Sequence, residues 1–223
     1  MGISKKYKLT DETIQVGDIT LHRIEALMNF SNVYKGEKGG FVESEDNLSH
    51  NGDCWVYGTA KVCGNARVVD NAKVGGNAEV YGNASIYGDA LIYDNAEVFG
   101  NAKVLTHANI CDNAKVWGNT VIADNTNVYG DAKVCGDAII YGRAEVGGDA
   151  KVADNADYIV FKNWWSSGRY FTWTRSNNMW KVGCFYGTSE ELIAKAYKDS
   201  ELSGREYERV VKYVKSILID NKK

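Results

Sequence analysis

Residues 81–104 read YGNASI YGDALI YDNAEV FGNAKV, four copies of one six-residue phrase. Set in register with Tyr57, the phrase continues without a gap to Tyr158, which makes 17 hexads over 102 residues. Position four is Ala except for Thr120 and Thr126, and position six is Val or Ile until Tyr158 closes the series. A period this strict has to be interpreted before any other signal in the sequence.

Each hexad predicts a short strand followed by a corner. Positions four and six point inward, while position five and the next position one point outward. Gly-Asn, Asp-Asn or Gly-Asp at positions two and three supplies the backbone angles of a tight turn. A helix of 3.6 residues per turn cannot produce a spacing of six with this alternation. Three hexads therefore predict a triangular coil of 18 residues, and stacked coils would pair as parallel strands.

This pattern resembles that of the hexapeptide-repeat proteins, which fold as left-handed parallel β-helices. The resemblance implies a mainly β chain with a left-handed parallel β-helix, a triangular prism, over residues 54–158. With the irregular hexad around Cys54 there are about six coils, and a strand spacing of ~4.8 Å gives a prism roughly 29 Å tall. We expect residues 1–53 to form a cap with a strand hairpin, and residues 159–223 to form a small α+β domain of three strands and two helices.

The coil register divides the outward-facing side chains among three faces, one of which is too apolar to face water along its whole length. Proteins of the family are usually trimers, so the resemblance favours a neighbouring subunit over the chain's own C-terminal segment as its cover. The apolar residues of this predicted homotrimer interface are Val69, Tyr87, Leu105, Val121, Ile139 and Tyr141. A second face carries Tyr81, Phe99 and Trp117 one coil apart. This ladder is expected to stack between coils, with a ligand platform as the alternative.

The repeat offers few catalytic groups. The best-known enzymes that it resembles are acyltransferases, which use a His as general base in the cleft between subunits. Here the repeat contains one histidine, His107 at a corner, and no hexad is interrupted by a loop that could enclose an acyl donor. The carbonic anhydrases of this fold need three His ligands for zinc. We expect no catalytic residue, no metal and no cofactor, with an acyltransferase that uses His107 as the alternative.

Residues 157–223 contain no hexads, and four of the six tryptophans lie within residues 164–180. Turn signals divide the aromatic part into three strands, and TSEE at residues 188–191 is typical of a capping box that opens a helix. If two helices cover one face of this sheet, aromatic rings and Arg or Lys on the other face would suit base stacking and phosphate neutralisation. The candidate ligand-binding residues are Arg169, Trp173, Arg175, Trp165, Trp180 and Lys181. In so small a domain we expect most of the tryptophans to pack in the core, with ligand stacking on an open face as the alternative.

The distribution of charge and the cysteine content restrict the kinds of ligand and the cellular compartment that we expect for this chain. Residues 157–223 hold 12 Lys and Arg against 8 Asp and Glu, a balance of +4, whereas the preceding residues hold 14 against 21, a balance of −7. A small anionic ligand would meet the basic end, and the acidic remainder disfavours long nucleic acid. Five cysteines without a CxxC motif favour reduced thiols in a cytoplasm. We expect no membrane association, because there is no long apolar run and no signal peptide.

The two ends add a narrower resemblance. The opening (YKLTDET…LHRIEAL), the GNA and GDA hexads and the ending (VGCFYGTSEEL) together are similar to a group of phage and prophage accessory proteins. The resemblance implies an accessory role in a bacterial cytoplasm, and it supplies no functional residues. The sequence therefore predicts a non-enzymatic trimer that sequesters a small anionic, nucleotide-derived ligand such as a host defence signal. The alternative is a structural adaptor that presents its C-terminal domains to a protein partner.

Overall fold

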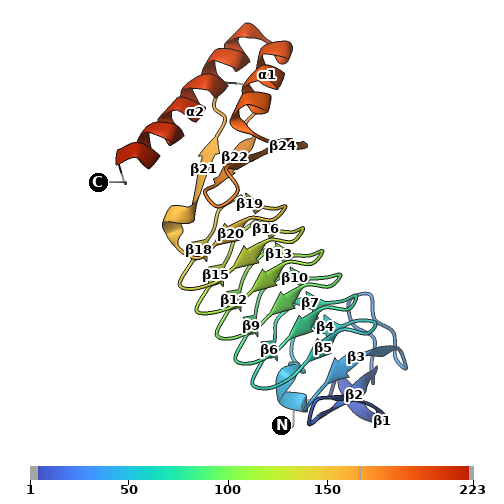
Figure 1. Ribbon diagram of the computed structural model, residues 1–223. Helices are drawn as coiled ribbons and strands as arrows, with labels where there is room; N and C mark the ends of the chain where they lie inside the picture. Colours follow the sequence, from blue (N-terminus) through green and yellow to red (C-terminus); the bar gives the residue numbers. More distant parts are fainter. Residues whose placement is uncertain (1–4, 166, 221–223) are drawn as a thin grey trace. The chain divides into compact units, whose positions relative to one another are not determined.

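The chain forms two compact units, Met1–Asn155 and Ala156–Lys223 (Figure 1). This computed structural model describes residues 5–165 and 167–220. The cap that the sequence predicts over residues 1–53 belongs to the same compact unit as the repeat, and does not form a domain of its own.

The repeat folds as a parallel β-solenoid of about six turns, as the hexads predict. Its two-residue strands stack into three sheets, which we name by their outward side chains. The aromatic face contains β1 (Tyr7–Val16), β2 (Ile19–Ala26), β3 (Lys38–Val42), β5 (Lys61–Val62), β8 (Glu79–Val80), β11 (Glu97–Val98), β14 (Lys115–Val116), β17 (Lys133–Val134) and β20 (Lys151–Val152). The apolar face contains β6 (Arg67–Val68), β9 (Ser85–Ile86), β12 (Lys103–Val104), β15 (Val121–Ile122) and β18 (Ile139–Ile140). The third face contains β4 (Trp55–Val56), β7 (Lys73–Val74), β10 (Leu91–Ile92), β13 (Asn109–Ile110), β16 (Asn127–Val128) and β19 (Glu145–Val146).

The core follows from the two inward positions of the hexad. Strand partners are one coil apart, as in the pairing of Lys61 with Glu79 and of Glu79 with Glu97. Position four and position six are fully or almost fully buried throughout the regular coils, so small Ala side chains alternate with β-branched Val or Ile inside the prism. Thr126, one of the two exceptions at position four, is buried as well and donates its hydroxyl to the Ala123 carbonyl at 2.7 Å.

The corners are held by backbone conformation and by side-chain ladders. Position two has a positive φ, which Gly adopts without strain and which Asp112 also adopts at 58°. The Asp112 carboxylate accepts a hydrogen bond from the Gly130 N–H of the next coil at 2.9 Å. At position three, side-chain amides bond from coil to coil at 2.9 to 3.0 Å, in the order Asn65, Asn83, Asn101, Asn119 and Asp137. Each corner therefore has its own polar column outside the core.

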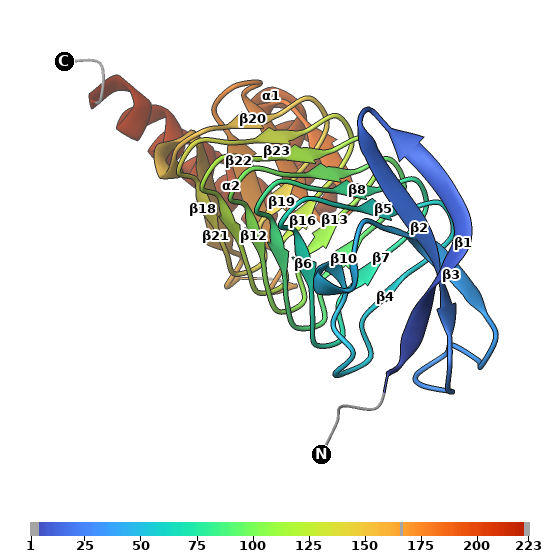
Figure 2. The same cartoon turned by 90° about the horizontal axis from the view of Figure 1, so that it is seen from below.

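The N-terminal strands extend the aromatic face beyond the first coil (Figure 2). β1 and β2 form the predicted antiparallel hairpin around Gly17, whose φ is 59°, and β2 pairs antiparallel with β3. β3 then pairs parallel with β5, so the hairpin is continuous with the solenoid. Beside it, the buried Lys6 ammonium donates to the carbonyls of Gly52 and Cys54, and burial lowers the pKa of this lysine. These contacts close the N-terminal end of the core.

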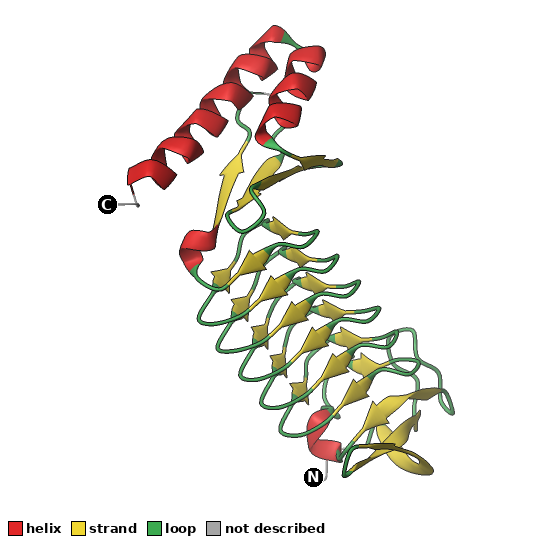
Figure 3. Ribbon diagram, in the orientation of Figure 1, coloured by secondary structure: helices red, strands yellow, loops and turns green. Residues whose placement is uncertain are grey.

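The C-terminal unit is a four-stranded antiparallel sheet with two helices (Figure 3). Its elements are β21 (Tyr158–Lys162), β22 (Tyr170–Thr174), β23 (Met179–Val182), β24 (Phe185–Gly187), α1 (Ser189–Asp199) and α2 (Glu201–Asp220). The expected three strands were one too few, because Gly183, with a φ of 55°, and Cys184 make a two-residue turn into the short β24. The predicted capping box is confirmed, with Thr188 as the N-cap of α1.

The second helix begins at Glu201, directly after the end of α1. Ser200 ends α1, and its hydroxyl accepts a hydrogen bond from the Ser203 N–H at 3.1 Å, so one serine serves both helix ends. Across the described residues, neither helix combines the length and the apolar character needed to cross a bilayer.

Candidate functional site

The two central tryptophans of the predicted ligand site lie in the core of the C-terminal unit. Trp173 is 2% exposed and Trp180 is fully buried, in a cluster with Leu192 of α1 and Val211 of α2. Their indole N–H groups donate to Asn178 Oδ1 and Ser189 Oγ, each at 3.0 Å. The helices therefore cover the face that carries these rings, and the expected stacking of a ligand on them across an open face is not found.

The remaining four candidates do not converge. Trp165 is half-buried and packs against Tyr207, with ring centroids 5.7 Å apart. Arg169 and Arg175 are exposed just before and just after β22, about 20 Å apart for an extended strand at ~3.4 Å per residue. Lys181 follows Trp180 along β23, so its side chain points to the opposite face of the sheet. The six candidate residues therefore do not form one site: the tryptophans pack against the helices, the two arginines lie at opposite ends of β22, and Lys181 is on the other face of the sheet.

His107 occupies a polar corner, as the sequence predicts. Its ring is 66% exposed, and Nε2 lies 3.5 Å from the Asp89 carboxylate in the coil before it. The other carboxylate oxygen of Asp89 accepts from the Asn71 amide at 3.1 Å. These contacts continue the corner column of position three.

The most ordered array of side chains on the surface of the solenoid is on the aromatic face. Tyr81 and Phe99 stack with ring centroids 4.8 Å apart and planes 2° from parallel, and Phe99 and Trp117 stack at 5.6 Å and 3°. The coil register places Cys63 one rung before Tyr81 and Cys135 one rung after Trp117. The sequence prediction that the rings stack between coils is confirmed. Phe99 is therefore stacked on both of its faces, by Tyr81 on one side and by Trp117 on the other.

A column of charged side chains runs beside this ring ladder. Lys61 bonds Glu79 at 2.7 Å, and Lys115 bonds Glu97 at 2.6 Å. The Tyr81 hydroxyl donates to the Glu97 carboxylate at 3.5 Å. Burial, assisted by the negative charges of Glu97 and Glu79, raises the pKa of Tyr81 to about 12. The phenol therefore stays neutral across the whole physiological range.

A cleft of about 220 Å³ opens at the first rung of the ladder, between the hairpin and the aromatic face. We call it the ladder-end cleft. Val16, Ile19 and Leu21 line it from the hairpin, on either side of the turn at Gly17, and β1 and β2 can be followed in Figure 2. From the solenoid it is lined by Lys61, Cys63, Glu79, Val80 and Tyr81. Typical ligand pockets measure ~300–1,000 Å³, so this one suits a single ring system.

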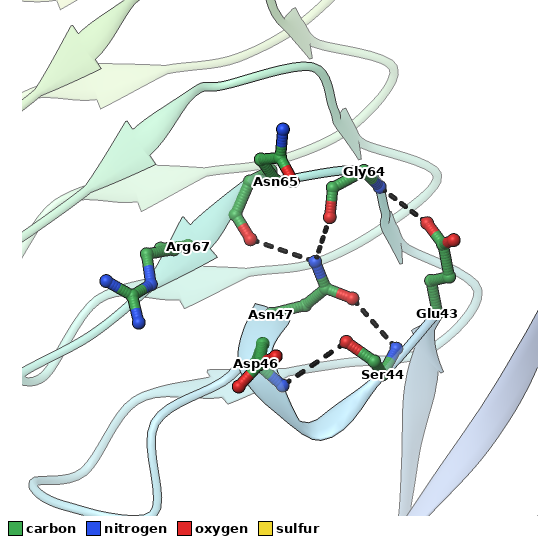
Figure 4. A pocket seen from close by; sticks show the side chains of 8 residues that line it. Glu43, Ser44, Asp46, Asn47, Gly64, Asn65 and Arg67 are labelled. Carbon is green, nitrogen blue, oxygen red and sulfur yellow. Dashed lines mark hydrogen bonds between the residues drawn. The ribbon is translucent and has the colours of Figure 1, made fainter.

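A larger cavity of about 580 Å³ lies under the first corner, with a polar lining of Glu43, Ser44, Asp46, Asn47, Gly64, Asn65, Ala66 and Arg67 (Figure 4). The buried Asn47 is at its centre. Its amide donates to the carbonyls of Gly64 and Ala66, each at 2.9 Å, and accepts from the Ser44 N–H at 2.9 Å. Asn47 thus donates to the carbonyls that would otherwise accept hydrogen bonds from N–H groups of a preceding coil. The side of the cavity that Asn47 forms is therefore a structural cap of the solenoid.

Three side chains on another corner approach one another closely enough to consider a metal. Ligand atoms of Asp94, Cys111 and Asp112 lie within 4.8 Å of one another. Burial, with the two nearby carboxylates, raises the pKa of Cys111 to about 11, so the thiol remains protonated at neutral pH. Asp94 already accepts from the Asp112 N–H at 3.3 Å. We interpret the group as part of a corner column.

No protein-family model matches this chain, and no curated protein matches it. The ladder-end cleft on the aromatic face and the half-exposed apolar face both lie outside the core of the solenoid. Sequence reasoning identified the ladder and the apolar face, but not the cleft, which depends on where the hairpin packs.

Replacing Asn47 by Ala should lower the free energy of unfolding by about 3 kcal/mol, since unmet buried polar groups cost ~1–3 kcal/mol each. The measurement is urea unfolding of the full chain followed by circular dichroism. Asn101→Ala, which removes an exposed amide of a corner column, is the matched control. Equal losses in the two variants would contradict the capping role.

An alkaline titration should show one phenol that ionises near pH 12 in the native protein and disappears in Tyr81→Phe. Because the folded-state pKa is raised, the unfolded chain ionises first, so this group's stabilising contribution is lost as the pH rises from about 10 to 12. The measurement is the difference in tyrosinate absorbance between the two proteins. If the missing phenol titrates near pH 10, the ring is not buried in the ladder.

Proposed function

We propose that this chain is a non-enzymatic binding protein that captures a small nucleotide-derived ligand at the ladder-end cleft. The observation that carries the proposal is that Tyr81, the first ring of a stack of parallel rings, lines a cleft. Val16, Ile19 and Leu21 supply apolar walls around it. Capture of this kind requires tight binding and a high concentration of sites, and no reacting group on the protein.

The resemblance to hexapeptide-repeat proteins, and to phage and prophage accessory proteins, supports a role as a sink for a signalling molecule such as a host defence signal in a bacterial cytoplasm. The charged groups at the cleft are Lys61 and Glu79, one cation and one anion, while the basic balance of residues 157–223 belongs to the other compact unit. An acyltransferase that uses His107 receives no support from the contacts of that side chain.

We further propose that the protein is a homotrimer assembled through the apolar face. Ile139 and Tyr141 are 43% and 62% exposed in the single chain, although both are large and apolar. Val69, Tyr87, Leu105 and Val121 continue the same face and are half-buried. A continuous apolar strip of this kind marks an interaction surface more often than a solvated one. A second and third copy of the chain would cover it.

Ile139→Asp should convert the trimer to a monomer, because it places an unpaired charge in a desolvated interface. Light scattering at micromolar concentration measures the mass, which should fall from three times 24.7 kDa to the mass of one chain. Lys133→Asp, an exposed substitution on the aromatic face, is the control and should leave the trimer intact. A wild-type protein that is monomeric would contradict this proposal.

Native mass spectrometry of the purified protein should detect a bound small molecule that heat releases chemically unchanged. In Tyr81→Leu the bound fraction should fall sharply, because the open ring face is gone. At a ligand concentration of 100 times Kd, binding would add about 2.7 kcal/mol to the free energy of unfolding, which a thermal shift can follow. A ligand that the protein converts to a product would contradict simple capture. So would a ligand that Tyr81→Leu retains in full.

A further inference from the structure

The geometry of the ring ladder restricts what can enter the ladder-end cleft. Neighbouring rings of the ladder are parallel within 3°, and the backbone register fixes their spacing from coil to coil. A flat guest that lies parallel to Tyr81 would continue the stack as the next rung. Offset stacking at centroid distances of about 4.5–7 Å is favourable for such a pair.

Cys63 provides no ring at this rung. It takes the column position that Tyr81, Phe99 and Trp117 take in the following coils, and its side chain is too short to cover the face of Tyr81. Burial raises the pKa of the Cys63 thiol, so it is a neutral and weakly polar floor for the cleft. The volume of about 220 Å³ is sufficient for one ring system and not for a branched ligand of drug size.

The rim of the cleft has a donor and an acceptor side by side. Lys61 and Glu79 form an ion pair at 2.7 Å, and both side chains are only partly exposed, at 30% and 38%. The ammonium carries three donors, and the carboxylate has lone pairs beyond the one that it shares with Lys61. A ring edge that presents an acceptor beside a donor can bond both groups at once, whereas a hydrocarbon ring can bond neither.

We propose that the ladder-end cleft binds a nucleobase as the next rung of the ring ladder, with Tyr81 as the stacking platform and Lys61 and Glu79 as the groups that read its hydrogen-bonding edge. Adenine, for example, presents N1 as an acceptor beside the N6 amino donor. Base stacking on an aromatic side chain is largely independent of base identity, so the ion pair supplies the selectivity. This inference rests on the proposed capture function and names the chemical class of its ligand.

Two cysteine variants provide a matched test with folded proteins. Cys63→Phe adds the missing ring at the cleft end of the ladder, and Cys135→Phe adds one at the far end, beyond Trp117. Calorimetric titration of the full chain with adenosine and with guanosine should give binding in wild type and in Cys135→Phe. Cys63→Phe should abolish it, and Tyr81→Leu should weaken it roughly 10- to 100-fold. Glu79→Gln should change the ratio of the two affinities.

The outcomes separate this inference from the capture function itself. If neither nucleoside binds but naphthalene does, and Cys63→Phe blocks it, the cleft captures rings and the nucleobase assignment is overturned. If Cys63→Phe retains nucleoside binding at wild-type affinity, the site lies elsewhere and the inference fails. A co-purified ligand that is still present in Cys63→Phe would likewise overturn the ladder-end site, and would leave capture at another site as the function.

Discussion

Backbone hydrogen bonds between successive coils determine nearly everything else in the solenoid. The Lys61 N–H donates to the Ala78 carbonyl at 2.9 Å, and equivalent bonds repeat from coil to coil. Because these bonds hold residues one coil apart in register, side chains of like position form columns. Amide columns at the corners and the ring ladder on the aromatic face follow from this register. The ladder-end cleft follows too, because one residue of the ring column, Cys63, is too small to continue the stack.

Periodicity explains why the solenoid could be predicted so fully from the sequence. Its inward Ala and Val or Ile positions, its corners and its number of turns are each supported by many copies of the same hexad. The C-terminal unit has no such redundancy. β24 is three residues long and depends on the single turn at Gly183, while the start of α2 depends on the hydroxyl of Ser200. Each of these sequence signals occurs only once, so an error in interpreting one of them changes the predicted bounds or number of the strands and helices.

The candidate site shows the same contrast between local and long-range information. Phe171 and Trp173 alternate with Thr172 and Thr174 along β22, and this alternation assigns the rings to one face. It does not say which face the helices cover, and here they cover the rings. The cleft is harder to predict from the sequence. Val16 and Leu21 line it together with Cys63 and Tyr81 only because the hairpin, which is far away in sequence, packs beside the solenoid. No repeat connects these segments.

A crystal structure of the full chain with bound adenosine would test the central claim most directly. We predict an adenine ring parallel to Tyr81 on the rung of Cys63, with its edge directed at the pair of Lys61 and Glu79. An adenine bound in the C-terminal unit or in the cavity around Asn47, with the ladder-end cleft unoccupied, would contradict the claim. It would mean that the ring ladder stabilises the coils and has no part in binding.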